Sequence, residues 1–138
     1  SMIFRIFNTY GPGEYYSEYR SVICRFAYCA VHKIPFTVYR RHYRTHTYID
    51  DAVEMIACLL DHFEDGGVIN VAGSHRTTIE ELASIIVKQA GLSEDFPIFK
   101  NAEPFTTTDK KVDNARILAI MGDFEETSFE DGLAAKLH

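Results

Sequence analysis

The chain opens on an apolar run, Met2 to Phe7, which a single arginine interrupts. A short run rich in isoleucine and phenylalanine is typical of a strand buried inside a sheet. Neither a turn residue nor a helix cap comes before it. Because domains usually begin in polar chain, we expect an upstream segment that normally covers this strand. Any fold for this chain must therefore accommodate a buried strand at its first residues.

Segments of strand length and of helix length alternate along the rest of the chain. The predicted strands cover residues 2–7, 36–39, 45–49, 68–72 and 96–100. The predicted helices cover residues 19–33 and 52–63, a segment opening at Thr77, residues 113–122, and a segment opening at Thr127. Strands separated by helices favour parallel pairing through helical crossovers. The sequence thus predicts an α/β fold.

Two of the predicted helices begin with a capping box. Thr77 with Glu80 opens one, and Thr127 with Glu130 opens the other. In such a pair the threonine oxygen and the carboxylate each accept from a free backbone amide. Gly91 stands where a left-handed residue ends the first of these helices. The apolar stripe expected on that helix is Ile79, Leu82, Ala83, Ile86 and Ala90.

Apolar spacing also predicts the buried faces of two further helices. The helix at 19–33 ends before Pro35, and its expected buried face is Ile23, Ala27, Ala30 and Ile34. For the helix at 52–63, either Asp50 or Asp51 is the expected N-cap. Its expected buried stripe is Val53, Ile56, Ala57 and Leu60.

Charge and cysteine content narrow the classes of function. The formal net charge of −6 argues against broad attraction to nucleic acid, although clustered arginines can still form a local anion site. The three cysteines form no CxxC pair, so we expect no disulfide framework and a cytoplasmic setting. We expect neither a membrane helix nor a signal peptide. With 138 residues, 46% of them hydrophobic, one domain with a substantial core is expected.

Four motifs follow one another along the chain. Residues 5–12 read R-I-F-N-T-Y-G-P, and residues 44–51 read R-T-H-T-Y-I-D-D. Residues 68–73 read V-I-N-V-A-G, and residues 113–122 begin D-N-A-R and end in glycine. In this order and spacing the motifs resemble those of the extended short-chain dehydrogenase/reductase family. The resemblance is to its NAD-dependent nucleotide-sugar epimerases and dehydratases, a branch that includes dTDP-glucose 4,6-dehydratases.

The resemblance implies the C-terminal, substrate-binding part of such an enzyme. That part combines the last strands of the nucleotide-binding sheet with a small substrate lobe of helices and strands. The family's glycine-rich NAD turn and its catalytic Tyr-x-x-x-Lys pair do not occur in the sequence. The nearest spacing, Tyr16 to Arg20, offers an arginine that stays too firmly protonated to replace the lysine. We therefore expect no catalytic residue in this chain. We expect the intact family enzyme to bind NAD, and this chain alone not to bind it stably.

Five residues are candidate substrate contacts. Asn8 follows the first strand, where open α/β sheets bind ligands; otherwise it is a turn asparagine bonded to backbone. The guanidinium of Arg44 matches phosphate geometry; otherwise it is a solvated arginine. Asn70 lies in an apolar strand and must find a partner, which is either the substrate's diphosphate or backbone. Arg20 and Tyr10 complete the set, with Tyr10 either stacking on a base or packing in the core.

The remaining candidates concern NAD and metals. Phe7 and Pro12 are the candidate cofactor contacts. His42 and His46 lie four residues apart without an evident third ligand, so no metal site is expected. The basic pair at residues 110–111 is expected either near the nucleotide or in solvent.

These features predict the nucleotide-sugar-binding part of an NAD-dependent epimerase or dehydratase. The alternative is a stand-alone binding or protein-interaction module derived from that fold. The predicted partners are a nucleotide sugar and a second copy of the chain, giving a homodimer or other self-association, with neither nucleic acid nor a membrane. Pairing is expected through residues 2–7, residues 68–72 or the helix at 19–33, because uncovered strand edges and apolar faces associate.

Since the acid/base pair is missing from the sequence, we expect no turnover of any nucleotide sugar by this chain. The measurement incubates the purified chain with NAD and a panel of UDP-, dTDP-, CDP- and GDP-sugars, followed by chromatography of the products. Turnover of any sugar by the purified chain would contradict the expectation.

Overall fold

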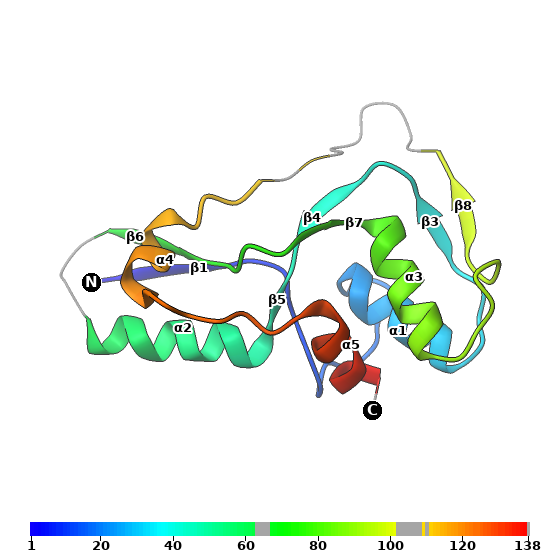
Figure 1. Ribbon diagram of the computed structural model, residues 1–138, viewed down its shortest axis with the longest axis horizontal. Helices are drawn as coiled ribbons and strands as arrows, with labels where there is room; N and C mark the ends of the chain where they lie inside the picture. Colours follow the sequence, from blue (N-terminus) through cyan, green and yellow to red (C-terminus); the bar gives the residue numbers. More distant parts are fainter. Residues whose placement is uncertain (63–66, 102–108, 110, 138) are drawn as a thin grey trace.

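The computed structural model describes residues 1–62, 67–101, 109 and 111–137, and it forms two lobes (Figure 1). The sheet lobe contains β1 (Ile3–Ile6), β6 (Val68–Val71), α2 (Ile49–Asp61) and α4 (Ala115–Met121). The helical lobe contains α1 (Val22–Val31), α3 (Ile79–Gln89), α5 (Phe129–Leu137), β3 (Thr37–Tyr39) and β8 (Ile98–Lys100). Four short strands join the lobes: β2 (Thr9–Tyr10), β4 (Tyr43–Thr45), β5 (Thr47–Tyr48) and β7 (Arg76–Thr78).

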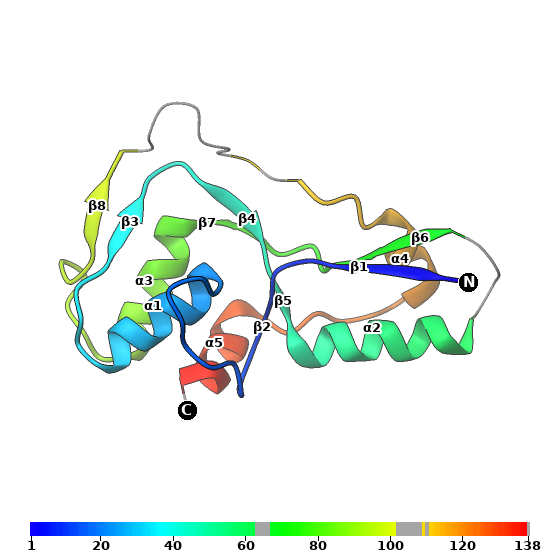
Figure 2. The same ribbon diagram turned by 180° about the vertical axis from the view of Figure 1, so that it is seen from behind.

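The strands pair two by two in the described part of the chain. β1 with β6, β2 with β5, and β3 with β8 are parallel pairs, whereas β4 and β7 are antiparallel. The view from behind in Figure 2 shows β2 and β5 crossing between the lobes. The α/β prediction is confirmed, and most pairs are parallel as expected. The predicted strand at 45–49 is divided: β4 ends at Thr45, β5 begins at Thr47, and Ile49 already belongs to α2.

The predicted cap and the predicted buried stripe of α2 are both wrong. The helix begins one turn earlier than expected, after Tyr48, and no side chain caps it. Asp51 instead accepts hydrogen bonds from the backbone N–H and the hydroxyl of Thr127, both at 2.8 Å. Its carboxylate thereby fixes α2 to the chain that enters α5.

The stripe fails because α2 has apolar residues on two faces. Val53 and Leu60 are 57% and 63% exposed. The buried residues of the helix are Asp51, Ala52, Met55 and Leu59. Successive residues of a helix differ in direction by about 100°. The predicted stripe is shifted by one residue from the buried one and therefore marks the wrong face. Residue 63, the last of the predicted helix, lies outside the described residues.

The N-termini of α3 and α5 show the same one-residue shift. The capping box of α3 joins Thr78 and Glu81, not Thr77 and Glu80. In front of α5 the hydroxyl of Ser128 accepts from the N–H of Asp131 at 3.2 Å, so the predicted Thr127–Glu130 box is also wrong. At the other end of α3, Gly91 has the expected left-handed conformation, with φ of +72°. The expected stripe of α3 is confirmed from Ile79 to Ile86.

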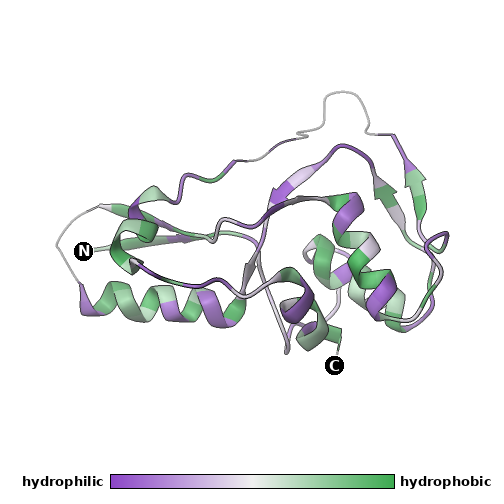
Figure 3. Cartoon of the chain, in the orientation of Figure 1, coloured by the Kyte–Doolittle hydropathy of each residue, from purple (hydrophilic) through white to green (hydrophobic). Residues whose placement is uncertain are grey.

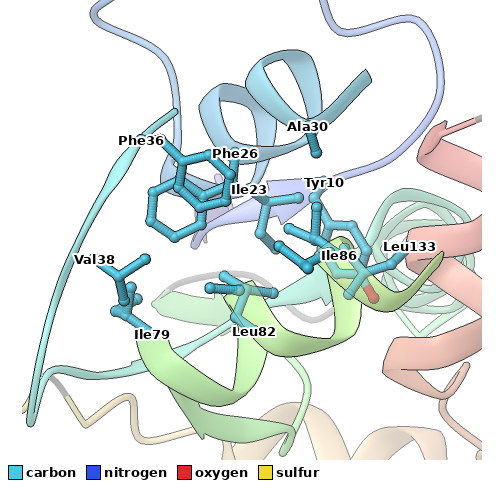
Figure 4. Packing of buried hydrophobic residues seen from close by; sticks show 12 residues of the cluster. Tyr10, Ile23, Phe26, Ala30, Phe36, Val38, Ile79, Leu82, Ile86 and Leu133 are labelled. Atoms are coloured by element: carbon cyan, nitrogen blue, oxygen red, sulfur yellow. The ribbon is translucent and has the colours of Figure 1, made fainter. Parts of the chain in front are cut away.

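Each lobe has its own hydrophobic core. Figure 4 shows the helical-lobe core, where Phe26 of α1 stacks on Phe36 at 4.5 Å between ring centroids. The faces of α1, α3 and α5 close around this core, with Ile23, Leu82, Ile86 and Leu133 at its centre. The sheet-lobe core consists of Ala52, Met55, Leu59, Ile69, Val71 and Ile117. Of the predicted face of α1, Ile34 lies beyond the helix and is 44% exposed. No helix in the described ranges is long and apolar enough to cross a membrane.

The capping box of α3 should contribute measurably to stability. Thr78→Ala removes the oxygen that accepts from the N–H of Glu81, and such a loss typically costs about 1 kcal/mol. Urea unfolding followed by circular dichroism gives the free energy of unfolding. Ser84→Ala is the matched control, because Ser84 is exposed in the middle of the same helix. Equal losses in the two variants would contradict a specific capping role for Thr78.

Candidate functional site

The candidate site begins at a turn between β1 and β2. Asn8 has φ of +41°, a left-handed conformation that asparagine tolerates better than most residues. Its side-chain amide donates to the carbonyl of Thr45 at 3.1 Å, and its own carbonyl accepts from the N–H of Thr47 at 3.2 Å. Asn8 therefore holds the β1–β2 turn against the β4–β5 segment.

Two cavities meet at Asn8 and Arg44, which line both of them. The first cavity, of about 310 Å³, lies against α1, β3 and the start of α3. Its lining is Asn8, Ser21, Val22, Arg25, Phe26, Thr37, Tyr39, His42, Arg44, His46 and Ile79. The second cavity, of about 520 Å³, is lined by Phe7, Asn8, Arg44, Asp109, Lys111 and Val112. Asn8 and Arg44 thus stand at the boundary between two separate spaces.

The first cavity is basic in an acidic protein. Arg25 and Arg44 contribute guanidinium groups, and no Asp or Glu occurs among the described residues of the lining. The whole chain nevertheless has a formal net charge of −6. Arginines concentrated in a cleft with apolar walls create a local positive potential. This cavity is therefore suited to an anion.

Asp109, which lines the second cavity, forms an ion pair with Arg76. Asp109 accepts two hydrogen bonds from Arg76, at 2.6 and 3.3 Å. These hydrogen bonds hold the pKa of the Asp109 carboxyl below its usual range. The guanidinium of Arg76 also lies 4.4 Å from the ring centre of Tyr43. Because Arg76 offsets the carboxylate, Asp109 weakens the positive potential around Arg44 less than an unpaired acid would.

His46 is the residue of the site that the sequence reasoning misjudged. The side chain is 4% exposed, and neither ring nitrogen has a hydrogen-bond partner among the described residues. Its ring plane is close to perpendicular to those of Tyr10 and Phe129, at 6.4 and 6.2 Å between centroids. Burial and then the charge of Arg44 lower the pKa of His46 to about 4, so the ring is neutral near pH 7.

The sequence did contain a signal for His46. On a strand, residues two apart share a face, so His46 should face the same side as Arg44. The spacing of His46 to His42 suggests only a metal ligand, and no metal site is expected there. Within the described part of the chain, no group of three or more His, Cys, Asp or Glu side chains is arranged to hold a metal ion.

The other candidate substrate contacts lie elsewhere. The side-chain amide of Asn70 donates to the carbonyl of Asp113 at 2.9 Å, so it has the backbone partner. Tyr10 is 3% exposed and packs in the helical-lobe core, where burial raises the pKa of its hydroxyl. Arg20 lines a separate cavity of about 280 Å³, whose lining also includes Pro12 and Tyr10. The structure thus brings Asn8 and Arg44 together, but not Asn70, Arg20 or Tyr10 with them.

The two candidate NAD contacts do not form one site. Phe7 lines the second cavity, whereas Pro12 lines the separate cavity that contains Arg20. The two candidate contacts therefore do not share a cavity, and we assign no chemical step to NAD. Of the basic pair at residues 110–111, Lys111 lines the second cavity, and Lys110 lies outside the described residues.

Solved structures of nucleotide-sugar enzymes share this fold. UDP-glucose 4-epimerase from Thermotoga maritima, solved with UDP-glucose, superposes with a TM-score of 0.82 and 20% identity over 99% of this chain and 44% of that one. UDP-glucuronic acid 4-epimerase from Bacillus cereus, solved with UDP-glucuronic acid and NAD, gives 0.81 and 24% over 99% and 43%. UDP-glucose 4-epimerase from Thermus thermophilus, solved with NAD, gives 0.78 and 22% over 99% and 45%. This chain spans less than half the length of each.

Sequence similarity identifies the family. A UDP-N-acetyl-alpha-D-glucosaminuronate decarboxylase from Bacillus cytotoxicus is 35% identical over 86 residues, which cover 61% of this chain and 27% of that protein. The model of the NAD-dependent epimerase/dehydratase family matches residues 1–72, more than half of the 138 residues. The matched region contains β1, Asn8, Arg44 and all of β6. The chain belongs to the NAD-dependent epimerase/dehydratase family.

Proposed function

We propose that this chain binds a nucleotide sugar as part of an NAD-dependent epimerase or dehydratase. The observation that carries the proposal is the position of Asn8 and Arg44 at the boundary of two cavities. Such a boundary suits a ligand with an anionic centre and an uncharged group at each end. A nucleoside diphosphate sugar has that layout.

The chemistry of each cavity supports one placement of the ligand. The diphosphate lies at the boundary, where the Arg44 guanidinium offers paired donors that match phosphate oxygens. The nucleoside occupies the first cavity, whose walls include the aromatic rings of Phe26 and Tyr39. The sugar occupies the second cavity, near Lys111 and the Asp109–Arg76 pair.

The related structures support the ligand class. The Thermotoga maritima and Bacillus cereus enzymes were solved with UDP-glucose and UDP-glucuronic acid. We propose the same class of ligand for this chain, with the acid/base group and most NAD contacts supplied by residues outside it. On this proposal the chain is the substrate-binding C-terminal part of a cytoplasmic enzyme and is inactive by itself. The roles of Arg20, Tyr10, Asn70, Phe7 and Pro12 stay predictions.

Arg44 should dominate the affinity for nucleoside diphosphates. Loss of a charge-assisted hydrogen bond typically costs about 1.5–3 kcal/mol, so Arg44→Ala should weaken binding roughly 10- to 100-fold. Calorimetric titration of UDP and dTDP into wild type and variant measures the change. Arg5→Ala is the control, since it removes the same charge from an exposed position on β1. Equal affinities of wild type and Arg44→Ala would rule out the proposed role.

We also propose that the chain self-associates through the sheet lobe. In the described residues β1 pairs only with β6, so one edge of each strand is unpaired. Ile3 and Ile6 are 57% and 53% exposed, and Val53 and Leu60 of α2 are exposed as well. Figure 3 shows hydrophobic segments recurring along α2 beside the two strands. Exposed apolar faces and strand edges both favour association, most often as a closed two-fold pair.

Light scattering over a concentration series should therefore show a mass above that of the monomer. Ile3→Lys places a charge on the exposed part of β1 and should shift the chain towards monomer. Tyr15→Lys is the matched control, because Tyr15 is exposed in the loop before α1. A wild-type monomer at every concentration would contradict the proposal and favour the stand-alone module.

A further inference from the structure

An acidic side chain lines the proposed binding site, and an arginine from outside that site pairs with it. Asp109 lines the second cavity together with Arg44 and Lys111. Arg76 of β7 lines neither of the two cavities that meet at Arg44, and it lines a separate groove beside α3 and α5 instead. Its guanidinium nevertheless donates to both oxygens of the Asp109 carboxylate, at 2.6 and 3.3 Å. The negative charge that Asp109 brings to the cavity is therefore offset from outside it.

Contacts with β4 hold the two charged groups in this arrangement. Tyr43 of β4 pairs with Thr78 of β7 and also forms a β-bridge with Asp109. The guanidinium of Arg76 lies 4.4 Å from the ring centre of Tyr43. Because a guanidinium is a rigid planar fork that stacks on aromatic faces, this ring helps to set the direction of its donors. The fork in turn directs the carboxylate of Asp109 toward Arg76.

The exposure of this ion pair indicates an effect on the ligand more than on the fold. The side chains of Arg76 and Asp109 are 38% and 35% exposed. Exposed ion pairs add little to stability, because water and salt screen them. An ionised carboxylate in the cavity would, however, repel an anionic ligand unless a cation offset its charge. The hydrogen bonds from Arg76 hold the pKa of the Asp109 carboxyl below its usual range, so it is ionised near pH 7.

We infer that Arg76 is a positioning residue of the proposed site, because its pairing with Asp109 keeps that carboxylate from opposing the diphosphate bound beside Arg44. The inference rests on the proposed function and gives that site a determinant of affinity that touches no ligand. Arg76 acts through its charge and through Asp109. The effect of losing Arg76 should therefore disappear when Asp109 loses its charge.

A double-mutant cycle tests this dependence, with UDP-glucose titrated calorimetrically into the whole chain. Arg76→Ala leaves the Asp109 carboxylate unpaired, so affinity should fall about five-fold or more by charge repulsion. Adding Asp109→Asn to Arg76→Ala removes the repelling charge and should recover most of that loss. In the wild-type background Asp109→Asn should raise affinity by a smaller factor, because Arg76 already offsets the carboxylate there.

Two further variants separate the charge of Arg76 from support of the fold. Arg76→Lys keeps the positive charge but not the planar fork, so it should lose less affinity than Arg76→Ala. The ratio of the wild-type and Arg76→Ala affinities should also shrink as salt is added, because salt screens exposed charges. Lys88→Ala is the matched control and should bind like wild type. It removes one positive charge from an exposed position on α3 that lines neither cavity.

Each outcome decides between the two claims. Saturable binding by wild type, with equal affinity in a folded Arg76→Ala, would overturn the inference and leave the proposed function standing. A loss in Arg76→Ala that Asp109→Asn does not reverse would also overturn the inference, since Arg76 would then act by supporting the fold. No saturable binding of UDP-glucose to wild type would overturn the proposed function and the inference together.

Discussion

The site depends on how Asn8 holds two distant segments together. Its left-handed backbone turns the chain from β1 into β2, while its amide and its carbonyl bond to Thr45 and Thr47. These two hydrogen bonds fix the β4–β5 segment beside the end of β1, and so set where Arg44 and His46 face. At position 8, a replacement residue that is strained in the left-handed conformation would weaken the turn. A replacement without a side-chain amide would lose the hydrogen bond to the carbonyl of Thr45. The structure thus shows Asn8 in its role as a turn asparagine bonded to backbone, and its contact with a ligand stays a proposal.

The sequence motifs put Asn8 at the end of β1 and Arg44 on β4, and the structure brings the two residues to the same two cavities. Their role in binding stays a prediction. Capping boxes were displaced by one residue because Thr77 and Thr78 both precede suitable acids, and tertiary contacts decide between them. The residues that a side chain hydrogen-bonds in the folded protein cannot be read from the spacing of residues in the sequence. Asp51 shows this, since its partner Thr127 lies 76 residues away in the chain.

The error on α2 has a physical origin that also explains the surface of the sheet lobe. A helix with one apolar stripe identifies its buried face unambiguously, but α2 has two such faces. Met55 and Leu59 pack in the sheet-lobe core, while Val53 and Leu60 stay exposed. Both stripes satisfy the same helical periodicity. The sequence therefore described a helix with two apolar faces, and the described residues cover one of them.

The local charge of the site follows from where the charged residues lie, not from the net charge of the chain. Among the described residues no Asp or Glu lines the first cavity, although the chain has a net charge of −6, and the Asp109 carboxylate of the second cavity is paired with Arg76. Burial, and to a smaller extent the charge of Arg44, lowers the pKa of His46 and keeps its ring neutral near pH 7. A neutral imidazole costs less to bury than an imidazolium ion. Asn8 and Arg44 lie together at the boundary of the two cavities, which is where we propose that an anion binds.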